Sequence, residues 1–212
     1  MIDTNPFIYA TDTIAGVDYS LRSTAICVIP SNPIANTIVP FASCEFYYLT
    51  DVRKDVVDEG NIHGTLIGDW DTPEERYESI AEWSLGVLQK HKCMSIGIED
   101  YAFRAANQSS LTQLAESTGL LKWMLHSNGI PYTKYSISKI KKFATSNGRS
   151  LKVQMYDAWI KDQGICLNSA FNRDPDVKPR SPVSDLVDAF YTACIHRIES
   201  CAMNYHYRKE KE

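Results

Sequence analysis

Five short apolar runs, each bounded by turn residues, predict strands in this chain. They cover residues 13–18, 24–29, 44–49, 95–99 and 131–135. The first three runs follow one another with no helical pattern between them, and this order favours an antiparallel meander. Pro30 ends the second run, because proline cannot donate a backbone hydrogen bond to a neighbouring strand.

Helical patterns alternate with the later strands. A helix is predicted to begin at Thr72, where Pro73 suits the first helical position and Glu75 completes a capping box. Apolar residues then recur every three or four positions. Similar patterns predict helices at residues 110–128, from about 138, from about 150, and from 183 to about 201. The whole order predicts an α/β fold with a mixed five-stranded sheet, three antiparallel strands followed by parallel ones, flanked by helices.

The 212 residues suit a single domain, which we place at residues 13–201. Residues 1–12 are irregular and predict an N-terminal extension, whereas residues 202–212 predict a charged C-terminal tail. The segment at about 51–72 is charged, contains three glycines and shows no clear period, so it predicts an inserted loop or a ragged hairpin. A further loop is expected at residues 163–182, which contain several prolines and asparagines.

The chain has no run of eighteen apolar residues, so neither a transmembrane helix nor a membrane partner is expected. Its first residues lack the basic and apolar regions of a signal peptide. The six cysteines include no C-x-x-C pair, and several stand inside apolar runs, so they predict small buried thiols rather than a zinc site. Together these features predict a cytoplasmic protein in a reducing compartment.

Charge is distributed unevenly along the chain. The formal net charge is −4, which taken alone argues against a nucleic-acid partner. Residues 101–156, however, contain eight basic residues and one acid, a net charge of +7, whereas the rest contains 14 basic and 25 acidic residues, a net charge of −11. This asymmetry favours binding of a polyanion by the basic segment, and a merely solvated basic face is the alternative.

Four carboxylates form the candidate site. Two predicted strands end in an acid, at Asp18 and Glu99, and ligands of α/β sheets commonly lie beyond the carboxyl ends of adjacent strands. Asp185 and Asp188 stand three residues apart near the start of the last helix, a spacing that puts both on one helix face. Alone, Asp185 could simply stabilise a helix N-terminus. Four clustered acids need positive compensation, and Mg²⁺ prefers carboxylate and phosphate oxygens.

These acids stand in motifs that resemble those of the RuvC family of Holliday-junction resolvases, which has the RNase H-like fold. GVDYS at 16–20 resembles the first-strand motif, IED at 98–100 the fourth-strand motif, and SDLVDA at 184–189 the motif of the final helix. KKFATSNGRSLK at 141–152 is similar to the family's glycine-containing basic stretch, and LAESTG at 114–119 to its small-residue helix. The motifs follow the family's order along the chain.

The resemblance implies a magnesium-dependent endonuclease that cleaves branched DNA such as four-way junctions. It implies that two Mg²⁺ ions, replaceable by Mn²⁺, are held by Asp18, Glu99, Asp185 and Asp188, and that Lys152 is also catalytic. The side chains expected to contact DNA are Lys139, Lys141, Lys142, Arg149, Lys152, Arg104, Tyr101 and Phe103.

A homodimer is also implied, because symmetric incision of a four-way junction requires two sites related by a two-fold axis. The helix at 110–128 is the candidate interface, since its apolar residues cover more than one core-facing side. They include Leu120, Leu121, Trp123, Met124 and Leu125. The alternative is that this helix is simply buried in the core.

The chain departs from the compact bacterial resolvases in two segments, residues 1–12 and about 51–72, and in the long loop before the last helix. Either Tyr101 or Phe103 could be the aromatic residue that follows the family's second acid. These departures favour a phage or viral relative.

Three other classes of protein remain open. Another RNase H-like nuclease would use similar acids, although a proofreading exonuclease would carry D-x-E where this chain has Asp18-Tyr19-Ser20. A sugar-kinase or actin-like ATPase needs a second glycine-rich phosphate loop, and the sequence contains none. A DNA-binding relative without activity would not need four intact carboxylates.

Overall fold

A mixed sheet forms the centre of the computed structural model, which describes residues 12–31, 38–100 and 108–209. Strands β1 (Thr13–Asp18), β2 (Ala25–Pro30) and β3 (Glu45–Thr50) form the expected antiparallel meander. On the other side of β1 lie β6 (Cys93–Asp100) and then β7 (Tyr132–Ser136), both running parallel to β1. The predicted fold class and the five predicted strands are therefore confirmed.

Two further strands extend the sheet, so it has seven strands in the order β4-β5-β3-β2-β1-β6-β7. Strands β4 (Asp58–Glu59) and β5 (Ile62–Leu66) come from the segment that was expected to be a loop or hairpin. β5 pairs in parallel with β3. The hydroxyl of Tyr48 on β3 helps to hold this insertion, because it donates to the Asp55 carbonyl at 2.7 Å and accepts from the Val57 amide at 2.8 Å.

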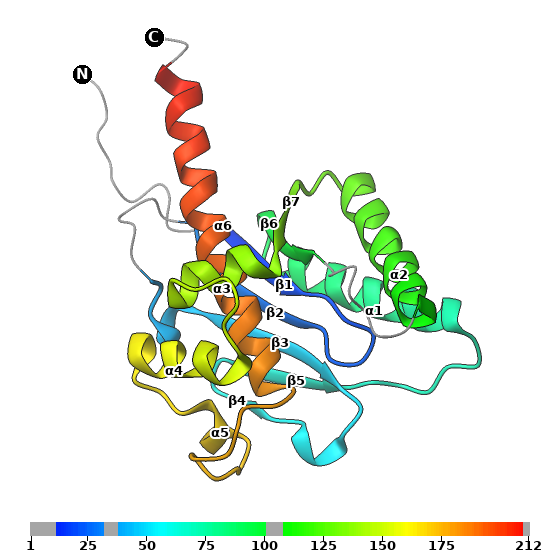
Figure 1. Cartoon of the computed structure of the whole chain (residues 1–212). Coiled ribbons are helices and arrows are strands. Elements are labelled where there is room, and N and C mark those ends of the chain that lie inside the picture. Colours follow the sequence, from blue (N-terminus) through cyan, green and yellow to red (C-terminus); the bar gives the residue numbers. More distant parts are fainter. Residues whose placement is uncertain (1–11, 32–37, 101–107, 210–212) are drawn as a thin grey trace.

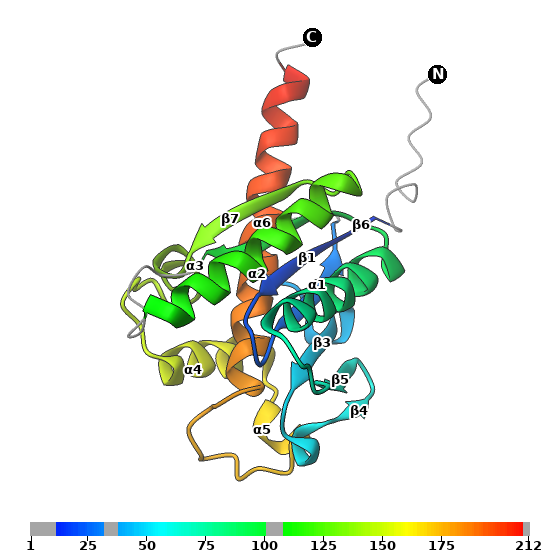
Figure 2. The same ribbon diagram turned by 90° about the vertical axis from the view of Figure 1, so that its right-hand side faces the viewer.

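Helices cover both faces of the sheet (Figures 1 and 2). On one face lie α1 (Pro73–Lys90) and α2 (Gln108–Ser127), whose Ile80, Leu88, Leu121 and Leu125 pack in the same core cluster as Val17 of β1. The predicted cap of α1 is present, since the Thr72 hydroxyl accepts a hydrogen bond from the Glu75 amide at 3.2 Å.

The other face is covered mainly by α6 (Val183–Lys209), with α3 (Ile137–Thr145), α4 (Lys152–Gln163) and the single turn α5 (Leu167–Ala170) beside it. Helix α6 is longer than predicted. Its backbone remains helical to Lys209, where the sequence suggested a helix end near Cys201 and a charged tail. The described helices include none that is both long and apolar enough to cross a membrane.

The loop before α6 is tied to the insertion by a buried ion pair. Arg173 contacts the Asp55 carboxylate at 2.8 Å, and the two side chains are only 8% and 11% exposed. The same guanidinium donates to the carbonyls of Arg180 and Ser181 at 3.3 and 3.0 Å. These bonds hold the chain immediately before α6, so the insertion helps to fix where that helix begins.

The cysteines are largely core residues, as predicted. Cys27, Cys44, Cys93 and Cys194 are buried free thiols, and Cys166 is half-buried. No disulfide joins any of these five described cysteines.

Candidate active site

Two glycines allow α6 to lie directly against the sheet. A Cβ atom added to Gly16 of β1 would collide with the backbone of Ala189 and Ala193 on α6. A Cβ atom added to Gly97 of β6 would lie 2.9 Å from the Cβ of His196 and 3.1 Å from the Thr192 carbonyl. Such close approach requires residues without a side chain. The two glycines therefore fix how closely α6 lies against β1 and β6.

This crossing brings the four acids together. Gly16 and Gly97 are paired in the β1–β6 register, and Asp18 and Glu99 each follow two residues later, on the same α6-facing side of the sheet. Asp185 and Asp188 lie one helical turn before Ala189 and Thr192, the α6 residues that contact the two glycines. The N-terminal turn of α6 is consequently placed over the carboxyl ends of β1 and β6.

Lys152 provides the cation at this cluster. It is the first residue of α4, and its Nζ lies 2.9 Å from the Ser184 hydroxyl and 3.3 Å from Asp185 Oδ1. The Ser184 hydroxyl donates in turn to Asp185 Oδ1 at 2.9 Å. The Lys152 side chain is 57% exposed, whereas that of Asp185 is 8% exposed. Lys152 can therefore reach both the buried acid and a ligand in solvent.

The acids strongly perturb one another's titration. Burial and the charges of Glu99, Asp185 and Asp188 raise the pKa of Asp18 well above its ordinary value. Burial, followed by the charge of Asp188, raises the pKa of Glu99 to about 8. Burial also raises the pKa of Asp188 to about 6, although Lys152 acts in the opposite direction. The pKa of Lys152 is raised, since the attraction of the acids outweighs its partial burial.

The donor set fits a hard divalent cation. Asp185 Oδ2 is buried and has no hydrogen-bond partner among the described residues, which is costly for a carboxylate oxygen unless a cation completes its contacts. Within the described part of the chain, no group of three or more acid, histidine or cysteine side chains is already arranged to hold a metal ion. Mg²⁺ does not require one, because it usually binds one or two carboxylates and completes its shell with water and substrate phosphate.

Apart from Lys152, the predicted DNA-contacting residues lie in different surroundings. Lys141 on α3 is close enough to Glu99 and Asp188 for its charge to oppose the rise that burial causes in the pKa of both acids. Lys142 and Arg149 are exposed nearby in the chain, whereas Lys139 points to Glu199 of α6 at 2.7 Å. The predicted contacts at Arg104, Tyr101 and Phe103 lie outside the described residues.

Sequence reasoning missed three contributors to this site. Gly16 and Gly97 stand in the quoted motifs or next to them, but their role depends on the helix that crosses them. Ser184 precedes the first acid of α6 and connects Lys152 to Asp185. A serine before an acid at a helix start is common, so the sequence alone contained no distinguishing signal.

The raised pKa values predict that stability without metal falls as pH rises. Between pH 4.5 and 8 the folded state retains a proton on Glu99 that the unfolded state has released, so ionisation favours unfolding. From pH 5.5 to 8, in EDTA, we expect this effect to lower the free energy of unfolding by roughly 3 kcal/mol, and Mg²⁺ to restore it at pH 8. Urea denaturation at both pH values measures the change.

Glu99→Gln removes the titrating group, so its free energy of unfolding should depend less on pH than that of the wild type. At pH 8 in EDTA, the variant should be more stable than the wild type. Glu78→Gln, at an exposed position of α1, is the matched control and should behave like the wild type. Parallel pH profiles for the wild type and Glu99→Gln would contradict the clustering of acids described above.

Comparisons with known proteins find one similar sequence and several similar folds. No protein-family model matches the chain. The chain is 29% identical over 142 residues to the crossover junction endodeoxyribonuclease RuvC of Ehrlichia ruminantium, an alignment that covers 67% of this chain and 77% of that protein. This bacterial protein and the two solved resolvases described next, from a bacterium and a yeast, give no support to the expected phage or viral origin.

Solved structures show the same fold. Thermus thermophilus RuvC in complex with a Holliday junction substrate superposes with a TM-score of 0.59 at 15% identity, covering 90% of this chain and 95% of that one. The yeast mitochondrial Holliday junction resolvase Ydc2 superposes with a TM-score of 0.55 at 14% identity, covering 96% and 85%. The chain is therefore similar in sequence to a RuvC protein and shares its fold with two solved Holliday junction resolvases.

Proposed function

We propose that this protein is a divalent-metal-dependent endonuclease that cleaves branched DNA and resolves four-way junctions. The observation that carries the proposal is the convergence of Asp18, Glu99, Asp185 and Asp188 with Lys152 at the carboxyl ends of β1 and β6. The resolvases to which the chain is similar supply the substrate class, since one of them is solved with a Holliday junction.

The four carboxylates would hold two Mg²⁺ ions, for which Mn²⁺ could substitute. When bound, such ions activate water and neutralise charge on the scissile phosphate. Lys152 has a third N–H donor beyond those used by Ser184 and Asp185, and this donor can meet a phosphate oxygen. Ser184 holds the lysine and the acid in one arrangement, so the protein contributes a positioned cation at the edge of the acid cluster.

The direct test compares three labelled substrates: a four-way junction, a linear duplex of the same sequence and an RNA–DNA hybrid. The purified protein should cut the junction in Mg²⁺ or Mn²⁺, leave the duplex largely intact and be inactive in EDTA. Preferential digestion of the hybrid would instead assign the chain to the RNase H-type nucleases. Binding to the junction without cleavage in either metal would indicate a non-catalytic relative.

Lys152→Ala is predicted to slow junction cleavage by about 100-fold, because the scissile phosphate loses its positioned cation and Asp185 loses its partner. Lys54→Ala removes an exposed lysine from the insertion and is the matched control, with a rate within about twofold of wild type. Single-turnover kinetics at saturating Mg²⁺ measure both. Equal small effects of the two substitutions would remove Lys152 from the reaction.

Helix α2 is the proposed surface for a homodimer. Leu121 and Leu125 are buried against the core, but Trp123 is 64% exposed, with Leu120 and Met124 only partly buried beside it. An exposed tryptophan with apolar neighbours is typical of an interface centre. A two-fold axis through α2 would supply the two active sites that symmetric incision requires.

Trp123→Glu is expected to convert a dimer into a monomer, because it places a charge at the centre of the apolar patch. Light scattering at micromolar concentration measures the mass of both proteins, and circular dichroism checks that the variant is folded. Lys122→Glu introduces the same residue one position away and controls for charge alone. A wild-type protein that is monomeric both free and bound to a junction would overturn the proposed dimer.

The buried thiols and the absence of disulfides among the described cysteines support a reducing compartment such as the cytoplasm as the site of action.

A further inference from the structure

A concave site lies on the opposite face of the sheet from the acids. It is a cavity of about 480 Å³ between α1 and the β3–β5 edge, a volume within the usual range for small-molecule sites. Tyr47 and the α1 side chains belong to the core cluster on this face, whereas the acids face α6. The residues that line the cavity are Tyr47, Asp58, His63, Gly64, Thr65, Trp83, Gly86, Val87 and Lys90.

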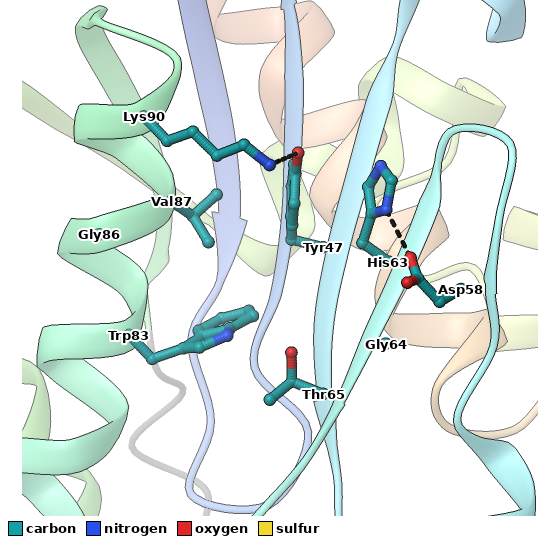
Figure 3. Close-up of a pocket in the computed structure, with 9 residues that line it drawn as sticks. All are labelled: Tyr47, Asp58, His63, Gly64, Thr65, Trp83, Gly86, Val87 and Lys90. Atoms are coloured by element: carbon teal, nitrogen blue, oxygen red, sulfur yellow. Dashed lines mark hydrogen bonds and ion pairs between the residues drawn. The ribbon is translucent and has the colours of Figure 1, made fainter.

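Aromatic rings form one side of this cavity. Tyr47 and His63, on neighbouring strands, are stacked with centroids 4.7 Å apart, and Trp83 approaches from α1 (Figure 3). His63 cannot rotate freely, because its Nδ1 lies 2.8 Å from Asp58 and its Nε2 lies 3.0 Å from Glu45. Tyr47 itself is buried, whereas Trp83 is only partly buried, so the Trp83 ring offers the surface on which a planar heterocycle can stack.

A lysine with unused donors stands at one end of the aromatic surface. Lys90 Nζ donates to the Tyr47 hydroxyl at 3.1 Å, and that hydroxyl lies 2.7 Å from His91 Nε2. Burial lowers the pKa of His91, so its neutral ring can accept a hydrogen bond from the Tyr47 hydroxyl, whose oxygen in turn accepts one from Lys90. No ion pair joins Lys90 to a carboxylate among the described residues, so two of its N–H groups remain for an anion.

A glycine keeps the cavity open. Gly86 lies in the interior of α1, where glycine is less favourable than alanine, yet a Cβ atom added there would meet nothing within 4 Å. Packing therefore does not require this glycine. A larger residue at position 86 would extend into the cavity. Glycine at this position therefore keeps the cavity open and does not stabilise the helix.

We propose that this cavity binds a nucleotide, with the base packed against Trp83 and the phosphate at Lys90. The Thr65 hydroxyl lies at the same cavity near Trp83 and can hydrogen-bond the edge of the base. The bound group is either a free nucleoside monophosphate or an unpaired nucleotide of a DNA strand, since both present one base and one phosphate. The site is independent of the acid cluster and does not require the nuclease activity.

The test is titration of the full-length protein with 2′-deoxyadenosine 5′-monophosphate in EDTA, so that no metal can bring the phosphate to the acids. Binding is followed by calorimetry and by the indole N–H resonance of Trp83, assigned with Trp83→Phe. We expect saturable binding that weakens about tenfold for deoxyadenosine, which lacks the phosphate. Inorganic phosphate should bind far more weakly. Phosphate that binds as tightly as the nucleotide, or a nucleotide that does not bind, would overturn the proposal.

Variants locate the binding. Gly86→Leu fills the cavity and should abolish binding, whereas Gly86→Ala controls for helix propensity and should lower it only slightly. Lys90→Gln should weaken binding about tenfold, with Lys161→Gln, an exposed lysine near the end of α4, as its matched control. Asp18→Asn should bind the nucleotide as the wild type does. Unchanged affinity in Gly86→Leu and Lys90→Gln would refute the site.

A 5′-phosphorylated trithymidylate distinguishes the two sources of the nucleotide. If it binds at least tenfold more tightly than thymidine 5′-monophosphate, and Gly86→Leu removes that gain, the site serves a DNA strand; equal affinities assign it to free nucleotides. Gly86→Leu and Lys90→Gln should still cut a four-way junction at the wild-type rate under saturating conditions. The proposed nuclease function and this second site can therefore fail separately.

Discussion

Asp18→Asn is expected to abolish cleavage of a four-way junction while the protein stays folded and still binds the junction. The substitution preserves size but removes one of four clustered negative charges, so divalent ions bind more weakly and the transition state loses several kcal/mol of stabilisation. We expect the rate to fall by about 1,000-fold or more. Affinity for DNA should persist, since it comes mainly from cations that meet phosphates.

Folding should not suffer, because the raised pKa of Asp18 shows that its charge is unfavourable in the metal-free protein. In EDTA at pH 8, Asp18→Asn should therefore melt at or above the wild-type temperature. Gel shifts in Ca²⁺, cleavage in Mg²⁺ and a thermal melt separate the three properties, with Asp69→Asn in the exposed insertion as control. A folded Asp18→Asn protein that cuts at the wild-type rate would refute the proposed site, and loss of folding would identify Asp18 as a structural acid.

Gly16→Ala is expected to be among the most destabilising single-methyl additions in this protein. The new Cβ atom would collide with the backbone of α6 at Ala189 and Ala193, and would lie 2.7 Å from the Ala193 Cα. Backbone atoms cannot move aside as a flexible side chain does, so the helix itself must shift. We expect a loss of about 3 kcal/mol or more from the free energy of unfolding.

The same shift should also disable the site, because α6 carries Asp185 and Asp188 to the ends of β1 and β6. Any folded Gly16→Ala protein should therefore gain less stability from Mg²⁺ at pH 8 than the wild type. Urea denaturation with and without Mg²⁺ measures both effects. Gly68→Ala adds the same methyl where nothing lies within 4 Å, and it should leave stability and activity near wild type. Wild-type stability in Gly16→Ala would mean that α6 does not rest on β1 as described.

Local patterns explain why much of the fold could be predicted. The period of apolar residues and the turn residues around each run located five strands and the start of α1, since strand and helix periodicity are properties of neighbouring residues. Four acids could be proposed as one site because strand ends and helix spacing already constrain where carboxylates point. The insertion was expected to be a loop or a ragged hairpin, and β4 and β5 do form a short antiparallel hairpin. Its addition to the main sheet was not predicted, because β5 has a short, partly exposed pattern and joins the sheet by pairing with β3.

The length of α6 was underestimated for a related reason. No glycine or proline ends the helix after Cys201, but the charged residues that follow suggested a tail. The contact that anchors the start of α6 could not be predicted either. Arg173 and Asp55 are more than one hundred residues apart, and either could have been a surface charge. Their pairing depends on the path of the insertion, which local sequence does not encode.

By itself, the sequence determined the strand order of the central meander, the alternation that follows it, and the four acids and one lysine that chemistry would need. Only the tertiary structure decided how close these groups lie. It did so through Gly16 and Gly97, which let the backbone of α6 rest on β1 and β6, and through Ser184, which joins Lys152 to Asp185. The physical reason is that periodicity and capping act over a few residues, whereas the pKa values and the buried, unpartnered oxygen of Asp185 arise from contacts between segments distant in the chain.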